Sequence, residues 1–214
     1  IIEQTPENVL VFSKLGELLP ESKFLLGVRD PRAIIAAMLQ VGQKALEKGE
    51  EPAFFTENTR SAISYVKRCF DAGFNASSTV PGKIYTIVYE KLVLNPEQEA
   101  QKICEFLDVP WSNEMLKPGE KKHMGESAIT TNSNEIWYDA KTYNSNPNTS
   151  SLEKWRNQLT PGQQLEINKT FSKSEDLKSL GYEFSLSNIS GFSKLYARIS
   201  YIITKLNFKV ISKI

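Results

Sequence analysis

The sequence predicts an α/β fold with a largely parallel sheet. Two short apolar runs, residues 24–28 (Phe-Leu-Leu-Gly-Val) and 84–89 (Ile-Tyr-Thr-Ile-Val-Tyr), are rich in strand-forming side chains and bounded by charged or turn-forming residues. Polar residues followed by proline mark helix starts before, between and after these runs. Strands that alternate with helices at this spacing are typical of parallel sheets with helical crossovers.

Four helix starts share one pattern, a capping residue followed by proline: Thr5-Pro6, Asp30-Pro31, Asn95-Pro96 and Thr160-Pro161. The capping side chain accepts a hydrogen bond from the first helical turn, and proline fits next because its missing N–H would have no partner there. Gln98 and Gln163 follow two of these caps at capping-box spacing. We therefore expect helices from near residues 6, 31, 96 and 161.

Two of these helices also carry apolar faces. Their residues fall at helical spacing and comprise Ile34, Ile35, Met38 and Leu39 after the second start, and Ala100, Ile103, Cys104 and Leu107 after the third. Such faces indicate helices that pack on a core. Residues 117–151 are polar and turn-prone instead, which predicts a long loop region around His123.

The composition narrows the classes of function. Lys and Arg number 26 against 25 Asp and Glu, a net charge of +1, so a surface built to bind nucleic acid is not expected. Two cysteines are too few for a disulfide framework, and we expect Cys69 and Cys104 to be small core residues. With one histidine, we expect no metal site. No run of about 20 apolar residues predicts a transmembrane helix.

The segment 187–214 differs from the rest of the chain. It has five Lys or Arg residues, no acid, and apolar residues at helical spacing. This pattern indicates a basic amphipathic helix, for which we expect packing on the chain's own domain, with contact to an anionic membrane surface or to a partner as alternatives.

The strongest candidate site is residues 28–32, Val-Arg-Asp-Pro-Arg. A strand ends, Arg29 stands at its carboxyl edge, and a capped helix begins at once. Ligands of open α/β sheets bind at this edge, a helix start attracts anions, and arginine matches phosphate oxygens. We expect a phosphate here; the alternative is a salt bridge between Arg29 and a neighbouring acid.

Six segments carry a family resemblance, in this order: residues 3–8 (EQTPEN), 24–36 (FLLGVRDPRAIIA), 89–97 (YEKLVLNPE), 105–111 (EFLDVPW), 151–156 (SLEKWR) and 180–182 (LGY). Together they resemble the sulfotransferases, especially the branch of the protein-tyrosine sulfotransferases and their bacterial relatives. The resemblance covers about residues 1–184.

The resemblance implies a P-loop NTPase-like parallel sheet flanked by helices. It also implies transfer of a sulfuryl group from 3′-phosphoadenosine 5′-phosphosulfate (PAPS) to a hydroxyl or amine of a carbohydrate, protein or small molecule, without a metal. In residues, Arg29 matches the arginine on the 3′-phosphate, Tyr89 a tyrosine that lines the nucleotide, and Lys154 a basic residue that closes over the phosphates. Trp137, with Tyr138 and Tyr143, is a candidate acceptor contact.

This sequence departs from the family pattern in three ways. The loop for the 5′-phosphosulfate, and the general base, would lie before residue 1, so we expect an N-terminally truncated domain over residues 1–186 that is inactive alone. Gln4 stands where the family often has lysine and brings no charge. Ala37 stands where the family often has a serine that helps to hold the 3′-phosphate.

The function expected from the sequence is therefore that of a sulfotransferase. The alternatives are a degenerate, non-catalytic binding module of the same fold and, less in keeping with the motifs at Arg29 and Lys154, a P-loop kinase. We expect a cytoplasmic protein of the bacterial type, with a Golgi-lumenal protein as the alternative. The acceptor and the oligomeric state are not predicted.

Overall fold

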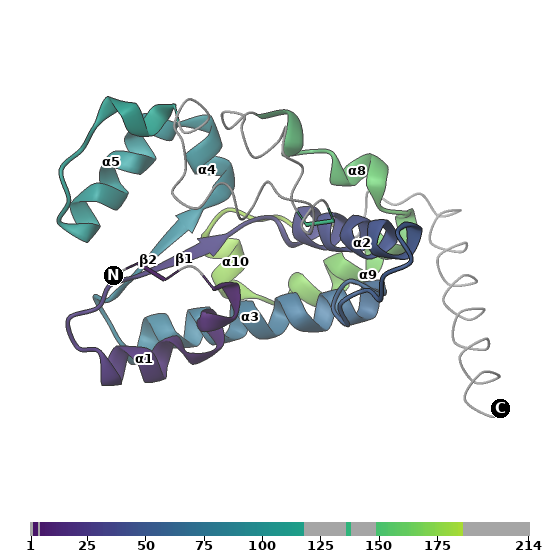
Figure 1. The fold of residues 1–214 in the computed structure, drawn as a ribbon, viewed down its shortest axis with the longest axis horizontal. Helices are drawn as coiled ribbons and strands as arrows, with labels where there is room; N and C mark the ends of the chain where they lie inside the picture. The colour runs from purple at the N-terminus through teal and green to yellow at the C-terminus, as the bar shows by residue number, and fades with distance from the viewer. Residues whose placement is uncertain (1, 4, 118–135, 138–148, 186–214) are drawn as a thin grey trace.

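Two parallel strands lie at the centre of the molecule (Figure 1). The structure is a computed structural model, which describes residues 2–3, 5–117, 136–137 and 149–185. Strand β1 (Phe24–Val28) pairs with β2 (Ile84–Val88) from Phe24↔Ile84 through Val28↔Val88. The predicted strands and their parallel pairing are confirmed, except that the second strand ends one residue earlier than expected.

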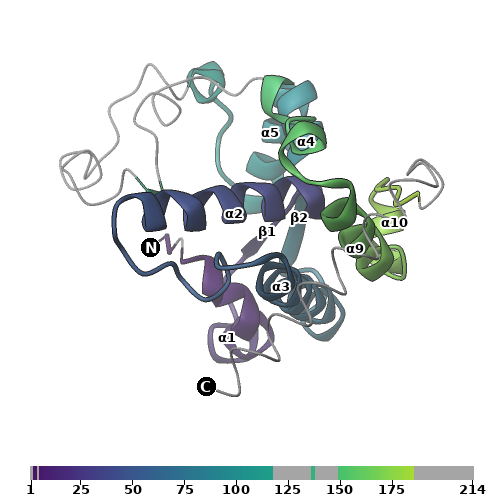
Figure 2. The ribbon, with the colours of Figure 1, turned by 90° about the vertical axis from the view of Figure 1, so that its right-hand side faces the viewer.

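Two long helices, α2 (Pro31–Glu47) and α3 (Thr59–Thr79), connect the strands. Figure 2 shows α3 on one side of the strands and, on the other, α4 and α5, the two helices that come directly after β2. Helix α3 packs closely on β1. A Cβ added to Gly73 would lie only 2.6 Å from the Leu26 Cδ1 atom, which shows how near the two elements come. Helix α3 was not predicted from the sequence. Its cap, Asn58, is followed by threonine rather than proline and accepts a hydrogen bond from the Ser61 N–H.

The N-terminal segment begins with a 3₁₀ helix, η1 (Pro6–Val11), which leads into α1 (Phe12–Leu18). The helix start expected near residue 6 is thus present, but its first part is 3₁₀. The Thr5 side chain does not cap it. Helix α1 packs on α3, where Gly16 meets Val80.

Two helices follow β2: α4 (Tyr89–Leu94) and α5 (Pro96–Leu107). The expected capping box at Asn95 and Gln98 is wrong, because the Asn95 side chain makes no cap hydrogen bond. Asn95 also ends α4, where its N–H donates to the Lys91 carbonyl 2.8 Å away, so its backbone serves two helices at once. A short 3₁₀ helix, η2 (Asn113–Leu116), follows.

The C-terminal part of the described chain consists of four short or medium elements. They are η4 (Thr149–Ser151), α8 (Trp155–Gln158), α9 (Pro161–Phe171) and α10 (Glu175–Ser179). The capping box predicted at the start of α9 is confirmed, since Thr160 and Gln163 exchange both hydrogen bonds.

The core joins this C-terminal part to the strands. Ile35 of α2 and Ile167 of α9 are fully buried, and Leu177 of α10 is also 0% exposed. Trp155 and Tyr182 belong to the same cluster of buried residues, at 3% and 8% exposure. Residues far apart in the sequence therefore close over the carboxyl ends of β1 and β2.

Several predictions fall outside the described residues. They concern Gln4, His123, Tyr138, Tyr143 and the segment 187–214. Of the two cysteines, Cys104 is buried as expected, whereas Cys69 is only half-buried. None of the helices in the described part of the chain is long and apolar enough to cross a membrane.

Candidate functional site

The parallel register of β1 and β2 places four residues side by side where the strands end. Val28 pairs with Val88, so residues 29 and 30 leave the sheet next to residues 89 and 90. The Arg29 guanidinium carbon lies 4.5 Å from the centre of the Tyr89 ring, and the Asp30 N–H donates to the Glu90 Oε1 atom over 2.9 Å. Arg29 and Tyr89, both predicted to contact the nucleotide, are thus brought together.

Arg29 is a half-buried cation with spare hydrogen-bonding capacity. Its Nη2 donates to the Ser151 carbonyl 3.2 Å away, while its Nε is buried and has no partner in the described part of the chain. Within the described ranges Arg29 forms no ion pair, so the alternative of a salt bridge is not found. A buried donor left unpaired costs free energy, which an anionic oxygen bound at this point would recover.

Asp30 and Arg32 neutralise each other. The Arg32 guanidinium donates to both carboxylate oxygens of Asp30, with an Nη2–Oδ2 distance of 2.7 Å and an Nε–Oδ1 distance of 2.9 Å. Its other face lies over Trp155, 4.2 Å from the ring centre, and near Phe184. Arg32 therefore has a structural role that the sequence did not indicate, and of these two arginines it is Arg29 that remains for a ligand.

The start of α2 does not offer the free amides that the sequence predicted. The Arg32 N–H donates to the Asp30 carboxylate over 2.8 Å. The Ala33 and Ile34 N–H groups donate to the Asp30 carbonyl over 2.9 and 3.1 Å, and Pro31 has no N–H. Because the cap occupies this turn, anion binding at this edge depends on the Arg29 side chain rather than on the helix start.

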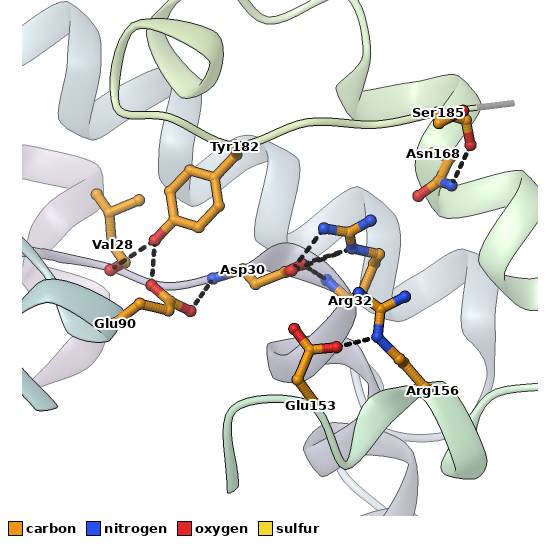
Figure 3. A network of polar contacts seen from close by, with 9 residues as sticks. All are labelled: Val28, Asp30, Arg32, Glu90, Glu153, Arg156, Asn168, Tyr182 and Ser185. Atoms are coloured by element: carbon orange, nitrogen blue, oxygen red, sulfur yellow. Dashed lines mark hydrogen bonds and ion pairs between the residues drawn. The ribbon is translucent and has the colours of Figure 1, made fainter. Parts of the chain in front are cut away.

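Glu90 and Tyr182 complete the network (Figure 3). The Tyr182 hydroxyl donates to the Glu90 Oε2 atom over 2.5 Å and also lies 3.3 Å from the Val28 carbonyl. Burial, and then the hydrogen bond to Glu90, raise the pKa of the Tyr182 hydroxyl, so it stays protonated. These two residues hold the turn that carries Arg29, and no local sequence pattern indicates a contact between positions so far apart.

The structure also describes three other residues predicted for the site: Lys154, Ala37 and Trp137. Lys154 is exposed just before α8, and within the described part of the chain no hydrogen bond or ion pair joins it to Arg29 or Tyr89. Ala37 is exposed on α2. Trp137 is 46% exposed, with its ring centre 5.9 Å from that of Phe55.

The arrangement can bind an anion through the Arg29 guanidinium. Among residues 2–3, 5–117, 136–137 and 149–185, no three His, Cys, Asp or Glu side chains are grouped to hold a metal ion. The Arg29 guanidinium stands at the strand edge, with the Tyr89 ring under it and the Ser151 carbonyl beside it. Part of its hydrogen-bonding capacity stays available for a ligand.

Comparisons with known proteins agree on one family. The model of the sulfotransferase family matches residues 1–113. A putative protein-tyrosine sulfotransferase of Caenorhabditis briggsae is 27% identical over 189 residues, which are 87% of this chain and 62% of that protein. One of Caenorhabditis elegans is 25% identical over 87% of this chain and 67% of its own length. The chain thus spans about two thirds of these relatives.

A solved structure supports the fold. The sulfotransferase domain from the curacin biosynthetic pathway matches with a TM-score of 0.56 and 21% identity, over 86% of this chain and 62% of that domain. The predicted α/β fold, here helix-rich with a small parallel sheet, is therefore confirmed. Since the family model covers more than half of the chain, the protein belongs to the sulfotransferase family.

Proposed function

We propose that this chain binds the nucleotide of PAPS and serves the transfer of its sulfuryl group to a hydroxyl or amine of a carbohydrate, protein or small-molecule acceptor. The observation that carries the proposal is the Arg29 guanidinium at the carboxyl end of β1, with a buried and unpartnered Nε. Its neighbours take only part of its hydrogen-bonding capacity, and the 3′-phosphate of the nucleotide is the group that we assign to the rest.

The local chemistry favours a phosphate over a carboxyl side chain of the protein. The nearest acid in sequence, Asp30, is fully engaged by Arg32 and by the start of α2. The Tyr89 ring lies under the guanidinium and supports the cation through its face. An arginine fork held in this way matches two phosphate oxygens.

In the proposed reaction, the bond between sulfur and the 5′-phosphate oxygen of the donor breaks. A new sulfur–oxygen bond (sulfur–nitrogen for an amine) forms to the acceptor, the acceptor's proton is released, and adenosine 3′,5′-bisphosphate leaves. Arg29 would bind the nucleotide at a phosphate that does not react. Such an anchor contributes position rather than chemistry, and position is a large part of catalysis in transfers of this kind.

Calorimetry with three nucleotides tests the proposal. We expect adenosine 3′,5′-bisphosphate to bind more tightly than adenosine 5′-monophosphate or ATP. We expect Arg29→Ala to weaken the bisphosphate by roughly 10- to 100-fold, as the loss of hydrogen bonds to a charged group requires. Arg68→Ala, at an exposed arginine of α3, is the control. Preference for ATP would favour the kinase alternative and contradict the proposal.

The alternative is a non-catalytic binding module. Ala37 supports it, because it offers no hydroxyl where the family often has serine, and Gln4 brings no charge. We expect this chain alone to bind nucleotide without turnover, which an assay with labelled PAPS and a panel of acceptors measures. Turnover by this chain alone that is abolished by Arg29→Ala would overturn that expectation and remove the alternative.

The acceptor side, the compartment and membrane contact stay predictions. The exposed Trp137 beside Phe55 is the acceptor contact that we propose on the described surface. Trp137→Ala should then raise the KM for acceptor in an active form and leave nucleotide affinity unchanged.

For the compartment we propose the cytoplasm, with the Golgi lumen as the alternative. Contact of residues 187–214 with anionic vesicles is tested by co-sedimentation with and without that segment.

A further inference from the structure

We propose that Glu90 and Tyr182 form a positioning pair that holds Arg29 in place and thereby sets the preference for a 3′-phosphorylated nucleotide (Figure 3). This inference rests on the proposed function and adds two residues to its site. Neither residue is assigned a contact with the nucleotide; both act through the turn that carries Arg29.

The pair holds the backbone on both sides of Arg29. On one side the Tyr182 hydroxyl lies 3.3 Å from the Val28 carbonyl, and on the other the Asp30 N–H donates to Glu90 over 2.9 Å. The residue between these two peptide groups is left little freedom in direction. Arg29 is therefore fixed at its backbone by residues that do not touch its guanidinium.

Glu90 is itself held at both carboxylate oxygens. Its Oε1 accepts from Asp30, and its Oε2 accepts from Tyr182 over 2.5 Å. It follows Tyr89, whose ring lies under the Arg29 guanidinium. The first two residues of α4 therefore both support Arg29, Tyr89 at the guanidinium and Glu90 at the backbone. A shift of Glu90 would move the aromatic support and the backbone anchor together.

Tyr182 reaches the pair because the chain turns sharply after α10. Gly181 has a φ of +99°, which side-chain-bearing residues rarely adopt, and its N–H donates to the Lys178 carbonyl. The Tyr182 N–H then donates to the Leu177 carbonyl over 3.0 Å, and the ring enters the core at 8% exposure. Tyr182, near the C-terminal end of the described chain, is thus held in a fixed position in the core.

The Arg29 guanidinium has few hydrogen bonds of its own, so its position depends on the backbone that carries it. Among the residues that the structure describes, Nη2 donates to the Ser151 carbonyl, whereas the buried Nε has no hydrogen-bond partner. Arginine loses much rotamer freedom when it binds a ligand, and a backbone fixed in advance lowers that cost. Loosening the pair should therefore weaken only ligands that have a phosphate for Arg29 to bind.

The first test needs no ligand and measures Arg29 directly. We expect ¹⁵N relaxation of the Arg29 Nε–H group to show a lower order parameter in Tyr182→Phe and Glu90→Ala than in the wild type. Tyr85→Phe, in β2 beside Phe106 of α5, is the matched control and should leave it unchanged. An Arg29 order parameter unchanged in both site variants would overturn the positioning role.

The second test compares nucleotides by calorimetry. The measured quantity is the ratio of the Kd for adenosine 5′-monophosphate to the Kd for adenosine 3′,5′-bisphosphate. Tyr182→Phe should lower this ratio by roughly 3- to 10-fold, the range expected for one lost hydrogen bond. In the Arg29→Ala background, Tyr182→Phe should lower the ratio no further, because both substitutions act through the same side chain.

The outcomes separate the two proposals. A wild-type chain that binds both nucleotides equally would overturn the proposed function, and with it the recognition role of the pair. A wild-type preference that survives Tyr182→Phe, with only the melting temperature lowered, would leave the proposed function standing and refute the positioning role. Should Tyr182→Phe not fold, Glu90→Gln gives the same readouts and retains an acceptor for the Asp30 N–H.

Discussion

Removing the Arg32 side chain should destabilise the fold strongly, although Arg32 is not assigned to the ligand. Its guanidinium donates to Asp30 with Nη2–Oδ2 and Nε–Oδ1 distances of 2.7 and 2.9 Å, and the two side chains are only 13% and 11% exposed. The same guanidinium covers the Trp155 ring at 4.2 Å. Arg32→Ala would leave the Asp30 carboxylate buried without its cation and uncover a core tryptophan.

The magnitude follows from that burial. Breaking a buried ion pair by removing one partner costs about 3–5 kcal/mol. Asp30 would keep its hydrogen bond from the residue 32 N–H, which favours the lower end, so we expect a loss of about 3 kcal/mol in the free energy of unfolding. Arg32→Lys should lose less, because it keeps the charge but not the planar fork.

Urea unfolding followed by tryptophan fluorescence measures this loss. Arg68→Ala, at an exposed arginine of α3, is the control and should change stability by less than about 0.5 kcal/mol. Asp30→Asn combined with Arg32→Ala should recover part of the loss, since the unpaired charge is its main cause. A loss below about 1 kcal/mol for Arg32→Ala would contradict this expectation, because breaking a buried ion pair costs more than that.

Three further predictions concern packing and pH. Gly42→Ala should cost about 1–3 kcal/mol by urea unfolding, since the new Cβ would lie 2.1 Å from the Thr56 carbonyl oxygen, whereas Gly27→Ala meets nothing within 4 Å and should be tolerated. Ile167→Ala, at a position with 0% exposure, should cost about 2–5 kcal/mol, and a loss below this range would show that the site collapses around the cavity. Burial and Glu90 raise the pKa of Tyr182 above its usual 10.0, so the folded chain keeps this proton after the unfolded chain has lost it. Stability should therefore fall as the pH rises past the unfolded value, by up to about 1.4 kcal/mol per pH unit for this group. Tyr182→Phe should flatten that fall, and an unchanged slope would contradict the shift.

The sequence predicted the site where the information is local. A strand, a cation and a capped proline stand next to one another at residues 24–31, and the structure has β1, Arg29 and the Asp30 cap there. Tyr89 was expected to end the second strand, and it is instead the first residue of α4, directly after β2. The nucleotide role of these residues stays a prediction.

The sequence could not supply what depends on contacts across the fold. Tyr182 meets Val28 from 154 positions away, and only tertiary packing brings them together. Arg32 and Arg29 look alike in the sequence, and which one is left for a ligand is decided by the carboxylate of Asp30. Helix α3 was missed because its start lacks the proline on which the other predictions depended.

We propose above all that the Arg29 guanidinium binds the 3′-phosphate of the nucleotide. The most direct measurement follows the ¹H–¹⁵N signal of the Arg29 Nε–H group while nucleotide is added. We expect a large, saturable shift with adenosine 3′,5′-bisphosphate and little change with adenosine 5′-monophosphate, because Nε gains an acceptor only from the former. Equal shifts with both nucleotides, or none with either at saturation, would contradict it.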